Sequence, residues 1–220
     1  MSVRKRFDLE LEALQKEFLM LAEKSIKTLE KSFIVFTNKD MNTAKQIIEE
    51  DININQLEES INDQVILLLT KQQPIVGTDL RRLIVLLKAA ADMERVGDYA
   101  VKIAKATIRI GKDRFVTSIE LMEDMCYKTS LMLRHIVQAF IDENTTKAKE
   151  IAELDDDIDE MYRNIIKHLM SLSNVKPEYV PQITYLSFVC RSIERCADHA
   201  TNIAEYLFYL KKGLRLDLNN

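Results

Sequence analysis

Residues 194–204 read ERCADHATNIA, and residues 94–104 read ERVGDYAVKIA. The two segments lie 100 residues apart and agree at six of eleven positions, whereas unrelated segments would agree at roughly one. In each copy a glutamate and an aspartate stand four positions apart, so a helix would stack their carboxylates one turn apart on one face. The chain therefore contains an internal repeat that carries a carboxylate pair in each half.

The repeat also covers an earlier segment in each half. Residues 44–54 match residues 148–158 at six positions with an offset of 104, and the match includes Asp51 and Asp155. Each half is therefore predicted to contain one copy of the same helical unit.

The composition favours long helices. Of 220 residues, 47% are hydrophobic and 30% are charged, and only 4 Gly and 3 Pro are present to break helices. Apolar residues recur at helical spacing, and turn signals divide them into six segments. The predicted helices span about residues 7–36, 41–71, 79–110, 115–141, 145–172 and 178–212, with Asp40 and Thr78 as N-caps and Gly111 and Gly213 as ends.

Short connections between such helices make neighbours antiparallel. We therefore predict an all-α protein of two tandem antiparallel three-helix bundles. The first bundle is expected in residues 1–113 and the second in residues 114–220.

Charge and hydropathy disfavour several classes of function. The net charge of −4 and the lack of a dense basic run make nucleic acid a poor partner. The longest apolar runs, residues 65–69 and 83–87, are far shorter than a membrane span of about 20 residues. The basic start has no apolar segment after it, unlike a signal peptide. We therefore expect a cytoplasmic protein with its three cysteines reduced and mostly buried.

Carboxylates interrupt helical rows that otherwise point inward. Two such pairs lie in the repeated motif, a third lies in residues 155–159, and Asp51 has Asn55 at the matching place in the first half. Facing helices of a bundle could bring these oxygen atoms together, as hard or borderline divalent metals prefer. The candidate residues are Asp51, Glu94, Asp98, Asp155, Asp159, Glu194 and Asp198.

Two simpler interpretations stand beside a metal site. Paired carboxylates are usually a solvated face, or they form salt bridges, here with Arg95 and Arg195. Each arginine directly follows a glutamate and points about 100° away from it, so poor pairing is expected. No His follows a Glu by three positions, which argues against a ferritin-like di-iron oxidase. His199 is expected to be a boundary or surface residue.

The doubled Glu-Arg-x-x-Asp motif, on the third helix of each predicted bundle, resembles that of the PhoU family of phosphate-transport regulatory proteins. The resemblance covers nearly the whole chain, including its length and tandem layout. It implies a cytoplasmic, mostly dimeric all-α protein that represses phosphate uptake and the phosphate-starvation response. Such a protein would be a non-enzymatic adaptor between the ATPase subunit of the phosphate ABC transporter and a sensor histidine kinase, reaching the membrane only through these partners.

The resemblance also implies multinuclear iron or zinc clusters, one in each bundle. The first would use Asp51, Glu94 and Asp98. In that bundle, Asn55 stands where the family has a carboxylate. Lys102 stands where Asn is usual, and its ammonium could neutralise Asp98 without a metal. The second bundle is therefore the one expected to hold metal, and its residues would be Asp155, Asp159, Glu194 and Asp198, with Asn202 beside them.

Three functional hypotheses follow. The leading one is the regulatory adaptor, with any metal holding two helices in register. The second is a carboxylate-bridged multinuclear metal enzyme, a hydrolase or an oxidase, which would need an open coordination position. The third is a plain helical bundle whose carboxylates pair with Lys and Arg.

Overall fold

The computed structural model describes residues 3–71, 75–213 and 218. These residues form helices and connections, with no strand among them, and none of their helices is long and apolar enough to cross a membrane. The elements in order are α1 (Val3–Asn38), α2 (Met41–Glu50), α3 (Ile52–Lys71), α4 (Gly77–Ile110), α5 (Glu120–Ile141), α6 (Thr145–Ala152), α7 (Asp155–Val175), a 3₁₀ turn (Pro177–Tyr179) and α8 (Val180–Lys212).

All six predicted helical segments are present, which confirms the all-α fold. Two of them are divided, however, contrary to the prediction of continuous helices. The second segment breaks at Asp51 into α2 and α3, and the fifth breaks at residues 153–154 into α6 and α7. The two breaks occupy nearly equivalent places in the repeat, one at the candidate ligand Asp51 and the other directly before its counterpart Asp155.

Neither break contains Pro or Gly, so helix propensity gives no sign of them. At each one a backbone hydrogen bond spans three residues instead of four. Ile54 N donates to Asp51 O at 2.9 Å, and Leu154 N donates to Ile151 O at 3.1 Å. Such tighter turns are common where one helix ends and another begins.

The helix ends confirm some predictions and correct others. Asp40 caps α2, because its side chain accepts hydrogen bonds from the amides of Asn42 and Thr43. Gly111 and Gly213 end α4 and α8 at φ of 65° and 67°, a region that glycine enters without strain. Thr78 is not an N-cap, since α4 already begins after Val76. The fourth segment begins at Glu120 instead of 115, and residues 72–74 of the predicted loop lie outside the described residues.

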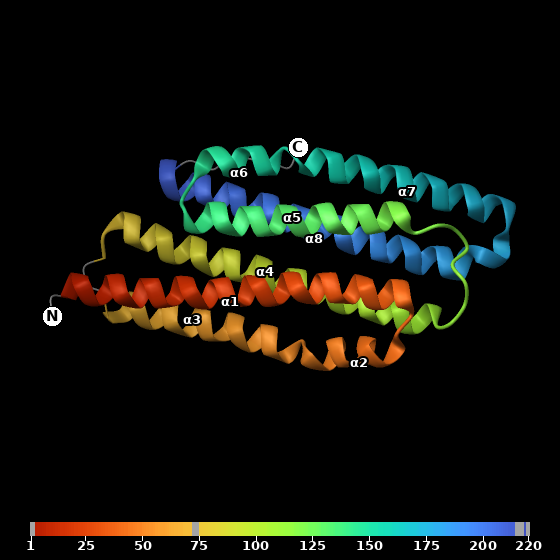
Figure 1. The fold of residues 1–220 in the computed structure, drawn as a ribbon. Helices are drawn as coiled ribbons and strands as arrows, with labels where there is room; N and C mark the ends of the chain where they lie inside the picture. The colour runs from red at the N-terminus through yellow and green to blue at the C-terminus, as the bar shows by residue number, and fades with distance from the viewer. Residues whose placement is uncertain (1–2, 72–74, 214–217, 219–220) are drawn as a thin grey trace.

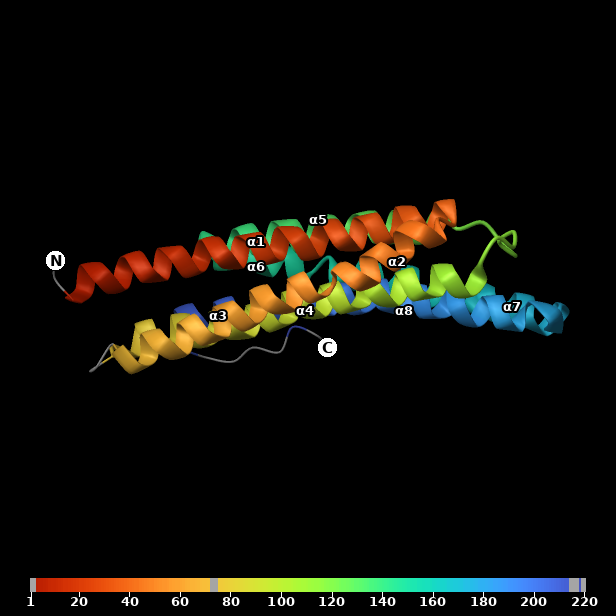
Figure 2. The same cartoon turned by 90° about the horizontal axis from the view of Figure 1, so that it is seen from below.

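The two halves pack side by side as an elongated body (Figure 1). Helices α1 to α4 make the first bundle and α5 to α8 the second. The view in Figure 2 shows α1 and α5 in one layer, above a second layer that contains α3, α4, α8 and α7. One cluster of buried apolar side chains runs through both bundles, so the halves share a core. Cys126, Cys190 and Cys196 are free and buried within it, as expected.

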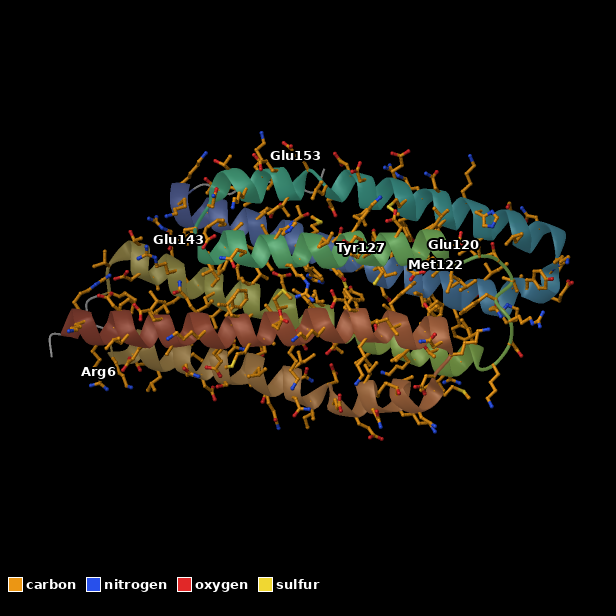
Figure 3. All side chains as sticks on the ribbon, in the orientation of Figure 1. Arg6, Glu120, Met122, Tyr127, Glu143 and Glu153 are labelled. Carbon is orange, nitrogen blue, oxygen red and sulfur yellow. The ribbon has the colours of Figure 1, made fainter. Side chains whose placement is uncertain are left out.

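Helices α4 and α8 run antiparallel along the middle of the molecule, and we call their contact the seam. Contacts between the two helices define the register of the seam: residue numbers fall along α4 as they rise along α8. Asp92 meets His199, and the Lys88 ammonium lies 4.8 Å from the Tyr206 ring centroid. Near one end, Glu143 accepts hydrogen bonds from Arg82 (2.9 Å) and from Lys211. Glu143 lies at the turn after α5 (Figure 3) and so ties that turn to both seam helices.

Candidate metal centres

The first cluster lies between the break at Asp51 and the middle of α4. Glu94 and Asp98 stand one helical turn apart on α4 and face this break. Burial, followed by the charge of Asp98, raises the pKa of Asp51 and the pKa of Glu94 above their ordinary values. The charge of Asp98 thus acts on both Asp51 and Glu94, and the structure brings the three predicted residues together.

The second cluster repeats this arrangement between α7 and α8. Asp155 is the first residue of α7, just after the break. Burial, followed by the charges of Asp198 and Asp159, raises the pKa of Asp155 to about 7. Burial also raises the pKa of Glu194 and the pKa of Asp198. The charges of the other three predicted carboxylates thus all act on Asp155, so the four lie in one neighbourhood.

The second cluster is the deeper of the two. The side chains of Glu194 and Asp198 are 12% and 21% exposed. Those of Glu94 and Asp98 are 20% and 29% exposed. A carboxylate loses more hydration where it is more buried, which is the main cause of its raised pKa.

An arginine sits on each cluster, contrary to the prediction of poor pairing. Arg95 Nη1 donates to Asp98 Oδ2 at 2.8 Å, and its Nε lies 3.6 Å from Glu94 Oε2. Arg195 makes the same contacts with Asp198 and Glu194 at 2.7 and 3.4 Å. The prediction considered only the neighbouring glutamate. The aspartate is three positions further on, where a long side chain on the same helix reaches it.

Several buried oxygen atoms of the clusters nevertheless accept no hydrogen bond from the described residues. They are Asp51 Oδ1, Asn55 Oδ1, Asp155 Oδ1 and Glu194 Oε2, of which Glu194 Oε2 lies 3.4 Å from Arg195 Nε. A buried acceptor without a partner is costly, and a cation would satisfy it. Because all four atoms are oxygens, their chemistry fits a hard or borderline divalent ion.

The clusters are not closed around an ion in this conformation. Among the described residues, no three His, Cys, Asp or Glu side chains converge as a metal site. Asp98 and Asp198 are each held by an arginine. Each arginine thus already occupies one oxygen, Oδ2, of an aspartate that is a candidate ligand.

The seam contains polar residues that sequence reasoning missed. Asp92 is 7% exposed, and its Oδ1 lies 2.5 Å from His199 Nδ1 and accepts a hydrogen bond from Asn202 Nδ2 at 3.2 Å. His199 was expected at a boundary or the surface, and it stands at the boundary between the two bundles. Asn202 was expected beside the second cluster, but its amide is directed to Asp92.

Lys102 also differs from expectation. It was expected to neutralise Asp98, but its ammonium lies 4.0 Å from the ring centroid of Tyr99. This is a cation–π contact, and it leaves Arg95 as the residue that neutralises Asp98. Positions 92, 99 and 102 differ from their repeat counterparts 192, 199 and 202, but so do positions 93, 96, 97 and 101, so the sequence does not single this region out.

Comparison with known proteins shows a family whose model matches both halves of the chain. A family model described as "PhoU domain" matches residues 18–107 and again residues 122–207. The two matches correspond to the two repeats, and each includes one Glu-Arg-x-x-Asp motif.

Individual relatives are similar over the whole chain. A protein of Clostridium acetobutylicum named as a phosphate-specific transport system accessory protein PhoU homolog is 34% identical over 217 residues, covering 99% of both chains. The similarly named Escherichia coli protein is 29% identical over 94% of this chain and 86% of its own. Among solved structures, PhoU of Streptococcus pneumoniae superposes with a TM-score of 0.90 at 32% identity, covering 96% of this chain and 99% of that one.

Proposed function

The chain belongs to the PhoU family, and on that premise we propose that it represses phosphate uptake and the phosphate-starvation response when phosphate is plentiful. The observation that supports this proposal is the match of both repeats, together with relatives named as accessory proteins of a phosphate-specific transport system. A full-length match at one third identity supports a shared role better than a shared fold alone would.

The proposed mechanism is scaffolding. The protein, as a cytoplasmic homodimer, docks on the ATPase subunit of a phosphate ABC transporter and on a sensor histidine kinase. The state of the transporter then decides which complex persists. Long helices packed on one core suit such a role, because they present extended surfaces that keep their shape.

The carboxylate clusters are proposed to hold multinuclear iron or zinc in this scaffold. Asp155, Asp159, Glu194 and Asp198 would hold it in the second bundle, which has four carboxylates. A bound ion would supply positive charge to the unpartnered oxygens and fasten α7 to α8. The first bundle would use Asp51, Glu94 and Asp98.

The alternative function, a carboxylate-bridged metal enzyme, is not supported. The relatives are named as accessory or regulatory proteins. Both arginines lie on the carboxylates where an enzyme would need an open position for its substrate.

The regulatory proposal is tested by deleting the gene and measuring phosphate uptake and phosphatase expression in phosphate-rich medium. Both are expected to rise, and a plasmid copy of the wild-type gene should restore repression. A matched plasmid with an early stop codon is the control. Unchanged uptake and phosphatase levels in the deletion strain would overturn the proposal.

A further inference from the structure

A large cavity opens on the seam beside the second cluster. It has a volume of about 810 Å³ and lies between residues 99–109 of α4 and residues 185–202 of α8. Small-molecule pockets in proteins commonly have volumes of about 300–1,000 Å³. The cavity is therefore large enough for a ligand of metabolite size, and both bundles contribute to its walls.

The cavity is strongly cationic in a chain whose net charge is −4. Among the described residues that line it, Asp198 is the one carboxylate, and Arg195 already holds it. Five cationic side chains face this single acid. They are Lys102, Lys105, Arg109, Arg191 and Arg195.

Three of these cations have no close partner. Within the described part of the chain, Lys105, Arg109 and Arg191 are exposed and make no hydrogen bond or salt bridge. Lys105 and Arg191 influence Asp51 and Glu194 only through their charge. Like charges grouped on two facing helices repel one another, and an anion between them removes this repulsion.

The cavity also presents aromatic surface. Phe188 is 58% exposed, so much of its ring is open to solvent. Its ring centroid lies 6.5 Å from that of Tyr185, which lines the same cavity. Tyr99 is already engaged by Lys102 and His199, so Phe188 offers more open ring surface for stacking than Tyr99 does.

Together the cationic side chains and the exposed aromatic ring indicate the class of ligand that the cavity would bind. Guanidinium and ammonium groups bind phosphate oxygens through charge-assisted hydrogen bonds. An exposed ring stacks on a planar base. We propose that this cavity binds a nucleoside di- or triphosphate, with the phosphates between Lys105, Arg109 and Arg191 and the base against Phe188.

Binding is tested by isothermal titration of the purified full-length protein with ATP, ADP, inorganic tripolyphosphate, adenosine and inorganic phosphate. EDTA is present throughout, so that no divalent ion links a phosphate to the carboxylate clusters. ATP or ADP should bind saturably, and tripolyphosphate should bind about tenfold more weakly for lack of a stacking base. Adenosine and inorganic phosphate should bind more weakly still.

Two variants separate charge from stacking. Lys105→Glu/Arg109→Glu should weaken both ATP and tripolyphosphate by more than about tenfold. Phe188→Ala should weaken ATP by about tenfold and leave tripolyphosphate within about twofold. Lys16→Glu/Lys71→Glu is the control, because it makes the same charge change on exposed lysines of α1 and α3. Circular dichroism confirms that each variant is folded.

Several outcomes would overturn the proposal. They are no saturable binding of ATP or ADP up to about 1 mM, equal loss in the control variant, or equal binding of tripolyphosphate with no effect of Phe188→Ala. Displacement of ATP by an acidic peptide that binds more tightly would also overturn it and identify the cavity as a protein-docking site. These measurements do not involve phosphate uptake, so their failure is distinct from failure of the regulatory proposal.

Discussion

The two bundles have the same backbone plan but different chemistry at their centres. Each breaks its second segment near the same point of the repeat, and each places an arginine over a glutamate–aspartate pair at nearly the same distances. The second cluster has Asp159 where the first has Asn55. The carboxylates of the second cluster are also more buried, and the pKa of Asp155, the first residue of α7, is raised to about 7.

This difference shows which parts of a duplicated unit are free to diverge. The apolar rows and the breaks are retained because both bundles need them to pack. The net charge at the centre can change, because a single Asp-to-Asn difference alters it without changing side-chain size. We therefore expect the second bundle to depend on a bound cation more than the first.

The largest expected effect concerns metal. A tightly bound ion present at about 100 times its Kd contributes about 3 kcal/mol to the free energy of unfolding. Glu194→Ala/Asp198→Ala should remove most of this contribution, while Glu94→Ala/Asp98→Ala should remove less than about half. Mass spectrometry measures the metal content of each variant. Urea unfolding with and without chelator measures the contribution of the metal to the free energy of unfolding. Equal losses of metal and of stability in the two variants would show that the second bundle does not depend on a cation more than the first.

The second effect concerns the seam, where the repeat partner of Asp92 is Ser192. Asp92→Ser should lower the free energy of unfolding by about 2–3 kcal/mol, because two donors lose a buried carboxylate. Ser192→Ala should cost less than about 1 kcal/mol, since Ser192 donates only to a carbonyl of its own helix. Urea unfolding compares the two, and a larger cost for Ser192→Ala would contradict the structure.

The third effect is a pH dependence. Because the pKa of Asp155 is raised above its unfolded value of 3.8, the folded state retains a proton that the unfolded state releases. Stability therefore falls as pH rises from about 4 to 7. In chelator, Asp155→Asn should stabilise the protein at pH 8 by about 1–2 kcal/mol, after allowance for solvent screening, and have little effect at pH 4.

Asp51→Asn is the matched control for this pH dependence. The pKa of Asp51 is also raised, but its cluster has one carboxylate fewer. A smaller gain at pH 8 is therefore expected. If Asp51→Asn stabilised the protein as much as Asp155→Asn, the assigned asymmetry of charge would be wrong.

The smallest effect concerns packing under the motif. A Cβ at Gly97 would lie 2.9 Å from Ile54 Cδ1, whereas the other copy has Ala197 at this place. Gly97→Ala should destabilise the protein by about 1 kcal/mol, because the crowding exceeds the gain in helix propensity. In an Ile54→Val background the same change should be neutral or stabilising. A double-mutant cycle by urea unfolding measures this coupling, and additive effects would show that Ile54 moves aside freely.

Much of the fold could be predicted because it is encoded locally and twice. Apolar spacing and a shortage of breakers predicted six helical segments, and the duplicated motif predicted where the carboxylates gather. The breaks at Asp51 and at residues 153–154 could not be predicted, because they arise from packing against α4 and α8 and not from helix-breaking residues. The division into domains at residue 113 stays a prediction.

The seam was harder to predict from the sequence than the clusters. Asp92 and His199 are 107 residues apart and belong to different bundles, so no helical spacing relates them. Asp92, Tyr99 and Lys102 are not repeated in the second copy, and the structure places all three where the bundles meet.

The antiparallel seam also sets an order of events during synthesis. Ribosomes add about 5–20 residues per second, so Asp92 emerges about 5–20 s before the His199 that partners it 107 residues later. During this interval the first bundle can close on itself, but its α4 face has no α8 to cover it. A neighbouring nascent chain offers the same α8 surface, so crowded translation favours exchange of second halves between copies. The short connection between Gly111 and Glu120 keeps the correct partner near and opposes this exchange.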